Sequence, residues 1–213
     1  MSTPNRRYST GLSFLDSRLD GGLPVGKLLA YTAPAGSQSE LLLFHMATAQ
    51  PMHYISTTHP DEIEISGSIE RSAISVPIDL EFTHAQPREL LEEPERYIGN
   101  IRPESFVVID PIDRLERADP DQYISFVNSV KRRLRETDSV GVFHGLDTTP
   151  IPDTRRLTLS RADFVWRLEQ LILSREIKTR LLVTKARGGR ALSEPIPLTF
   201  SDHVRVDTSR RIA

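Results

Sequence analysis

The sequence has no cysteine among its 213 residues, which excludes disulfide bonds, thiolate metal sites and cysteine nucleophiles. Neither sign of charge dominates: 27 Lys and Arg stand against 29 Asp and Glu. A basic balance that would indicate nucleic acid, or an acidic one that would indicate a solvating tail, is therefore missing. No run approaches the roughly 18 apolar residues of a membrane helix. The polar start "MSTPNRRYST" also lacks the apolar stretch of a signal peptide. We expect a soluble, cytoplasmic protein with no membrane partner.

Short apolar runs alternate with segments of helical period over the first two thirds of the chain. The expected strands span 28–32, 52–57, 75–82, 106–110 and 140–144, and the expected helices span 40–47, 88–97 and 119–135. Pro77 weakens the third strand because it removes a backbone donor. Asp119 followed by Pro120 is typical of a helix start. This alternation predicts an α/β fold with a mostly parallel central sheet flanked by helices.

The last third of the chain has a different pattern. Two strand-like segments, 163–173 and 179–187, are joined by a short polar turn and predict an antiparallel hairpin at the edge of the sheet. No low-complexity linker divides the chain. We therefore expect a single domain over 1–213, with 1–8 as a flexible basic arm.

Two segments are candidates for a phosphate-binding loop. "GGLPVGKL" (21–28) nearly matches G-x-x-x-x-G-K-[ST], but it precedes the first strand and no helix follows it. "APAGSQSE" (33–40) lies between a strand and a helix, where backbone N–H groups can converge on a phosphate. The second segment has the correct position without the expected residues.

The segment from Ser9 to Ala47 carries a longer pattern, S-T-G-x-x-x-L-D-x-x-L-x-G-G-x-P-x-G, followed by a strand, a loop and a helix. The matching residues are Ser9, Thr10, Gly11, Leu15, Asp16, Leu19, Gly21, Gly22, Pro24 and Gly26. The segment resembles the opening of KaiC-like proteins of the RecA superfamily. Further likeness lies at 106–110, 162–168, 184–188 and 197–200, so that the resemblance continues along most of the chain. The resemblance implies a RecA-like P-loop core with C-terminal antiparallel strands, and archaea, halophiles especially, as a source.

The resemblance also shows where the nucleotide-binding pattern is degenerate. Ala33 and Gln38 replace two glycines, Ser39 replaces the phosphate-binding lysine, and Glu40 replaces the Ser or Thr that holds magnesium. A lost charged hydrogen bond is worth about 1.5–3 kcal/mol. Glu40 would repel a polyphosphate, or it could simply favour the first turn of its helix. The degenerate loop consists of Ala33, Pro34, Ala35, Gly36, Ser37, Gln38, Ser39 and Glu40.

Other positions of the family's site are changed or ambiguous. Thr58 and His59 stand where the family has its catalytic acids, so no catalytic residue is assigned. Asp110 matches the Walker B aspartate and could hold magnesium, or it could accept hydrogen bonds from the loop. Asp113 is expected to be solvated or to cap a turn.

Lys185 and Arg187 match a pair that, in KaiC-like hexamers, reaches the phosphates of the neighbouring subunit. They could instead be ordinary surface cations of an edge strand.

Three functions remain open. The first is a non-catalytic pseudo-ATPase that regulates through protein contacts or self-association and needs no cofactor. The second is a weak ATPase that uses ATP and magnesium, with Asp110 as metal ligand and Lys185 and Arg187 acting in trans. The third is a recombinase-like protein that binds DNA through Arg6, Arg7 and the cations at 131–135.

Overall fold

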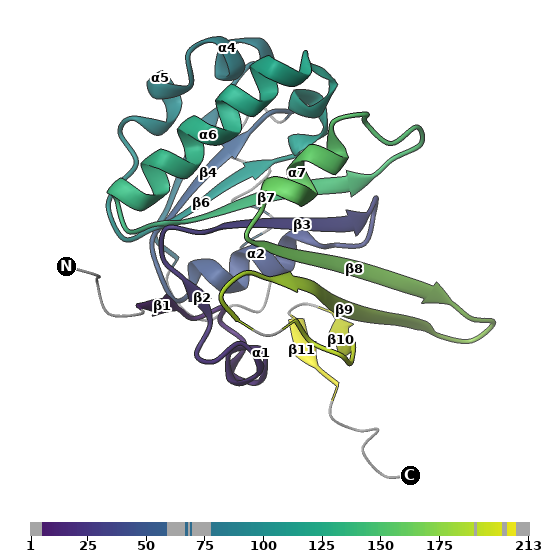
Figure 1. Ribbon diagram of the computed structural model, residues 1–213. Helices are drawn as coiled ribbons and strands as arrows, with labels where there is room; N and C mark the ends of the chain where they lie inside the picture. The colour runs from purple at the N-terminus through teal and green to yellow at the C-terminus, as the bar shows by residue number, and fades with distance from the viewer. Residues whose placement is uncertain are drawn as a thin grey trace.

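The computed structural model describes residues 6–58, 67, 69, 78–189, 191–201 and 204–207. A nine-stranded sheet with the order β11-β10-β9-β8-β3-β7-β6-β4-β5 runs through the molecule (Figure 1). Six neighbouring strands of this sheet, β8, β3, β7, β6, β4 and β5, pair in parallel. β9, β10 and β11 continue the sheet beyond β8 with antiparallel pairing. The predicted fold class is thereby confirmed.

The strands of this sheet are β3 (Leu28–Pro34), β4 (Met52–Ser56), β5 (Leu80–His84), β6 (Phe106–Asp110), β7 (Val140–Asp147), β8 (Phe164–Ile172), β9 (Ile177–Ala186), β10 (Ile196–Phe200) and β11 (Val204–Val206). The helical elements are α1 (Ser13–Arg18), α2 (Glu40–Ala47), α4 (Pro87–Glu92), α5 (Pro94–Ile98), the 3-10 helix η1 (Ile112–Arg117), α6 (Pro120–Glu136) and α7 (Arg155–Arg161). A separate two-stranded sheet pairs β1 (Arg7–Tyr8) with β2 (Leu23–Pro24).

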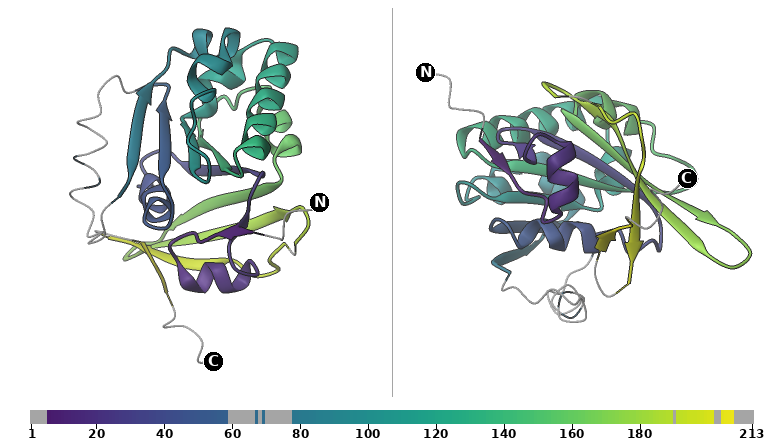
Figure 2. Two further views of the ribbon diagram at one scale, coloured as in Figure 1. Left: turned by 90° about the vertical axis from the view of Figure 1, so that its left-hand side faces the viewer. Right: turned by 90° about the horizontal axis from the view of Figure 1, so that it is seen from below.

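The sheet has a buried core on each face because successive side chains of a strand point to opposite sides. In β6, Phe106 and Val108 pack into the cluster that contains α2, whereas Val107 and Ile109 pack into the cluster that contains α6. Figures 1 and 2 show these two helices on opposite sides of the sheet. A strand buried on both faces needs the nearly continuous apolar sequence that marks β3 and β6.

Helix α6 follows its sequence signals closely. The Asp119 side chain accepts hydrogen bonds from the backbone N–H groups of Asp121 and Gln122, at 3.0 and 3.1 Å, so the predicted cap is confirmed. The apolar residues of the helix are buried at the helical period: Tyr123, Phe126, Val127, Val130 and Leu134.

Other elements differ from the expectation. The single helix expected over 88–97 is two short helices, because Pro94 cannot continue α4 and begins α5 instead. The third strand is β5 at Leu80–His84, and residues 75–77 of the expected strand lie outside the described residues. Helix α7 and the 3-10 helix η1 were not expected.

The expected arm over 1–8 is corrected at its end. Arg7 and Tyr8 pair with β2, the Tyr8 side chain is buried, and the Arg7 guanidinium donates to the carbonyls of Leu19 and Gly22. Residues 1–5 lie outside the described residues. Among the helices that are described, none has the length and apolar content to cross a bilayer.

Candidate functional site

The degenerate loop lies where the family pattern places it, between the carboxyl end of β3 and the start of α2. Ser37 N–H donates to the Pro34 carbonyl at 3.1 Å and closes a tight turn. Gly36 and Gln38 both have left-handed backbones, with φ of 80° and 54°. Gln38 stands at a glycine position of the pattern, and a left-handed conformation costs a residue with a Cβ about 1–2 kcal/mol. The turn therefore keeps its shape with a strained residue.

A buried imidazole joins this loop to the carboxyl end of β6. Ser39 Oγ lies 2.9 Å from His144 Nε2, and His144 Nδ1 lies 2.5 Å from Asp110 Oδ1. The His144 ring stacks on Tyr31, with 5.1 Å between ring centroids. The other Asp110 oxygen accepts a hydrogen bond from the Tyr54 hydroxyl. Four elements (the start of α2, β7, β6 and β4) thus meet in one hydrogen-bonded network.

In the family pattern that the sequence resembles, Ser39 aligns with the lysine and Asp110 with the Walker B aspartate. In the structure His144 contacts both residues. Each oxygen of Asp110 has a donor from the protein. Burial raises the pKa of Tyr54, and the Asp110 charge and hydrogen bond raise it further, so the phenol stays protonated as a donor. The aspartate is held by neighbouring side chains.

The order serine, histidine, aspartate is that of a hydrolase triad. A nucleophile must also be reached by its substrate, and here Ser39 and His144 are each only 2% exposed. The arrangement is therefore a structural link between the loop and the strands. Neither periodicity nor spacing could identify it, because Ser39 and His144 are 105 residues apart.

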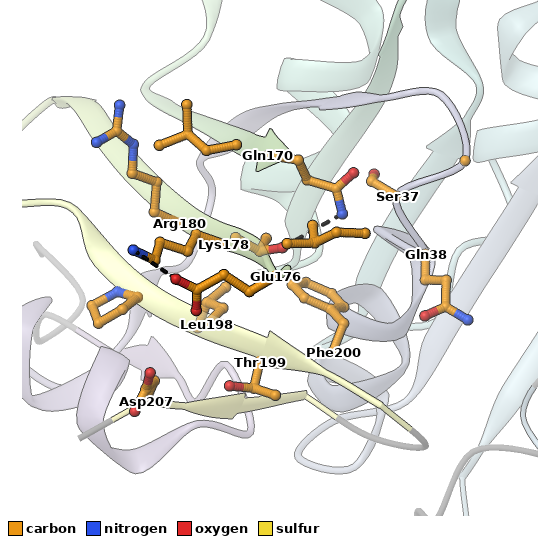
Figure 3. Close-up of a pocket in the computed structure, with 15 residues that line it drawn as sticks. Ser37, Gln38, Gln170, Glu176, Lys178, Arg180, Leu198, Thr199, Phe200 and Asp207 are labelled. Carbon is orange, nitrogen blue, oxygen red and sulfur yellow. Dashed lines mark hydrogen bonds and ion pairs between the residues drawn. The ribbon is translucent and has the colours of Figure 1, made fainter. Parts of the chain in front are cut away.

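A pocket of about 520 Å³ begins at the tip of the loop, at Gly36, Ser37 and Gln38. Figure 3 shows it bounded on the other sides by side chains of β9 and β10 and of the turn between β8 and β9. Its cations are matched by acids: Lys178 pairs with Glu176 at 3.0 Å, and Arg180 pairs with Glu169 at 2.8 Å.

The hydroxyl of Ser37 is buried at the loop end of this pocket, without a hydrogen-bond partner among the described residues. Ser39, Asp110 and His144 are not among the described residues that line it. The pocket thus reaches the loop without reaching the network behind it.

The remaining predicted residues lie in different surroundings. Thr58 is exposed just beyond the end of β4, and His59 lies outside the described residues. The Lys185 ammonium donates to the carbonyls of Leu159 and Ser160, at 3.0 and 2.8 Å. Arg187 is 58% exposed and lies 3.5 Å from an Asp163 oxygen.

Lys185 and Arg187 lie near the amino ends of the parallel strands, whereas the degenerate loop lies at their carboxyl ends. Phe164, at the amino end of β8, pairs with Ala186, whereas the loop follows the carboxyl end of β3. Parallel pairing of β3 with β8 therefore separates the two by the length of β3, about 20 Å. The pair cannot serve the loop of its own chain.

Asp113 is neither solvated nor a simple cap, contrary to the expectation. It is buried, accepts the Leu146 N–H at 2.9 Å, and pairs with Arg155 at 2.7 Å. Arg155 also binds Glu116 at 2.7 Å. Burial raises the pKa of Glu116, which Arg155 partly offsets. This ion network joins η1, β7 and α7.

No group of three or more His, Asp or Glu residues within the described ranges is arranged to hold a metal ion. The candidate site thus has three parts: the tight turn of the degenerate loop, Asp110 with its hydrogen bonds to Tyr54 and His144, and a pocket whose cations are paired with carboxylates.

The strand order and the loop after β3 are consistent with an α/β fold of the KaiC-like, RecA type. The structure is similar to that of the KaiC-like protein PH0186 from Pyrococcus horikoshii OT3, with a TM-score of 0.75 and 15% sequence identity. The match covers 95% of this chain and 99% of that one. By sequence, the chain belongs to the family described as "Family of unknown function (DUF7125)", whose model matches residues 7–213. No curated protein matches the sequence.

Proposed function

We propose that this chain is a non-catalytic relative of RecA-type ATPases, a single-domain pseudo-ATPase that acts through protein contacts. The observation that carries the proposal is the Ser39–His144–Asp110 network. It places an imidazole against the two residues that would meet the γ-phosphate and its magnesium. A chain built this way retains the loop geometry and has no lysine in it to bind phosphate.

Two further observations support the absence of turnover. The pocket beside the loop has its cations paired with carboxylates, so it offers a triphosphate little net positive charge. Thr58 follows β4 at the position of the family's catalytic acids, and a hydroxyl is not a general base at neutral pH.

The hairpin formed by β8 and β9 supports the second half of the proposal. It projects from the body of the protein (Figure 1). Four large apolar residues near its turn are exposed. Leu171, Ile172, Leu173 and Ile177 are 44%, 80%, 45% and 63% exposed. Large exposed apolar side chains grouped together mark interaction sites more often than single ones do. A partner protein or another copy of the chain would cover them.

The test is a titration of the purified protein with ATP and magnesium, followed by thermal shift and phosphate release, with size-exclusion chromatography in parallel. We expect no magnesium-dependent shift and no turnover. A shift that requires magnesium and disappears in Asp110→Asn, which keeps the shape of the side chain, would refute the proposal. Asp121→Asn is the matched control, because it makes the same replacement at an exposed residue of α6 outside the network.

One observation favours a weak, oligomeric ATPase as the second candidate. The Arg187 side chain is exposed at the edge opposite the loop, where it could contact the loop of a neighbouring subunit. In that case turnover would rise with protein concentration and Arg187→Ala would abolish it, while a monomeric, inactive protein would exclude it.

A further inference from the structure

A second pocket, of about 500 Å³, lies near the amino ends of the parallel strands, away from the degenerate loop. Five of its seven lining residues are cationic: Lys131, Arg132, Arg135, Arg161 and Arg187. Asn128, Lys131, Arg132 and Arg135 of α6 are spaced i, i+3, i+4 and i+7, so they share one face of the helix. Arg161 ends α7 and Arg187 follows β9. Cations from three elements thus converge on one space.

The two lysines of this region are engaged by the protein itself. Lys131 binds Asp163 and the Arg161 carbonyl, both at 2.8 Å, and Lys185 binds two carbonyls at the end of α7. Burial lowers the pKa of Lys185, and the charges of Arg187 and Lys131 lower it further, against the opposite effect of Asp163.

Two of the four guanidinium groups are paired with acids: Arg132 with Glu95 at 2.7 Å, and Arg187 with Asp163 at 3.5 Å. The other two carry the free positive charge of the pocket. Arg135 and Arg161 are exposed, and within the described part of the chain neither has a carboxylate within 4.0 Å. The stem of Arg135 is steadied by the turn at Gly26, where an added Cβ would lie 3.2 Å from Arg135 Cγ. A guanidinium is always charged and offers paired N–H donors that match two oxygens of one phosphate.

We propose that this pocket binds the oligophosphate group of a small free anion, a ligand of the pyrophosphate or tripolyphosphate type. Like charges gathered around one space repel one another, and a polyanion at the centre removes that repulsion. An oligophosphate, with its many oxygens and high negative charge, matches several guanidinium groups better than a ligand with a single carboxylate does.

The surroundings favour a small ligand over a nucleic acid. Glu95 and Glu136 both pair with Arg132 beside the pocket, and their exposed carboxylates would repel a phosphate backbone that continued past it. No aromatic residue is among the lining residues that are described, so bases would find no stacking platform. The proposal is independent of the pseudo-ATPase assignment, because the pocket shares no residue with the degenerate loop.

The test is isothermal titration of the full chain with tripolyphosphate at low salt and without magnesium. We expect binding that weakens as salt is added, and that weakens about tenfold or more in Arg161→Ala and in Arg135→Ala, since each removes a charged hydrogen bond. Arg88→Ala is the matched control, because it removes the same charge from a side chain that is 86% exposed on α4. It should bind as the unchanged protein does.

Asp110→Asn separates this site from the loop, and binding should be unchanged in it. Loss of tripolyphosphate binding in Asp110→Asn would assign the ligand to the loop and overturn the proposal. Undetectable binding at low salt, or equal affinity in both pocket variants, would also overturn it. Retention of duplex DNA through Arg135 and Arg161, with no affinity for tripolyphosphate, would replace it with a nucleic-acid site.

Discussion

Replacing His144 tests the network on which the proposed function depends. In His144→Ala, the half-buried Asp110 loses the donor to one oxygen and the buried Ser39 hydroxyl loses its partner. An unsatisfied buried polar group costs about 1–3 kcal/mol, and more when it is charged. Loss of the ring stacked on Tyr31 adds about 0.5–1.5 kcal/mol. We expect a loss of about 3–5 kcal/mol in the free energy of unfolding.

His144→Phe separates the two contributions. It keeps an aromatic ring against Tyr31 and removes both ring nitrogens, so it should recover the stacking part of the loss and no more. The measurement is urea unfolding of the three proteins, with thermal denaturation as a second readout. At roughly 2–4 °C per kcal/mol for a chain of this size, His144→Ala should melt roughly 10 °C lower.

A double-mutant cycle assigns the loss to the bond with Asp110. Asp110→Asn and His144→Phe should be non-additive, with a coupling of about 0.5–3 kcal/mol, because they remove the same interaction. Arg88→Ala, at an exposed side chain that makes no contact with the network, should add independently to either. An unfolding free energy for His144→Ala within about 0.5 kcal/mol of the unchanged protein would refute the reasoning, since that is the range of inconsequential surface changes.

Three further predictions concern the loop, the buried ion network and the hairpin. Gln38→Gly should raise the free energy of unfolding by up to about 1 kcal/mol in urea titrations, since glycine adopts the left-handed conformation without strain. Arg155→Met should lower it by about 3–5 kcal/mol, because Asp113 and Glu116 are left buried without their cation. Because Arg155 lowers the pKa of Glu116, its removal raises that pKa further, and folded Arg155→Met then binds more protons than its unfolded chain. The stability that Arg155→Met has lost relative to the unchanged protein should therefore be partly regained as the pH falls from 7 toward 5. Ile172→Ser should leave stability within about 0.5 kcal/mol and reduce any self-association seen by size-exclusion chromatography, and unchanged association would exclude the hairpin as the contact.

The elements with strong local signals could be predicted from the sequence. β3 and β6 are continuous apolar runs because both of their faces are buried, and α6 begins at a capping aspartate followed by proline. The position of the degenerate loop also followed from sequence, since a strand, a turn and a helix succeed one another there. Pro94, by contrast, divides a segment whose composition is helical throughout, and its effect depends on backbone geometry that a propensity does not contain.

The chemistry of the site required the tertiary structure. The sequence by itself determined the fold class, the place of the loop and the residues missing from it, because these depend on local order along the chain. Only the folded sheet placed His144 between Ser39 and Asp110, buried Asp113 against Arg155, and gathered Arg187 with the cations of α6 and α7 near the amino ends of the parallel strands. Side chains far apart in sequence meet only when parallel strands bring their ends together, and no local pattern records which of them will.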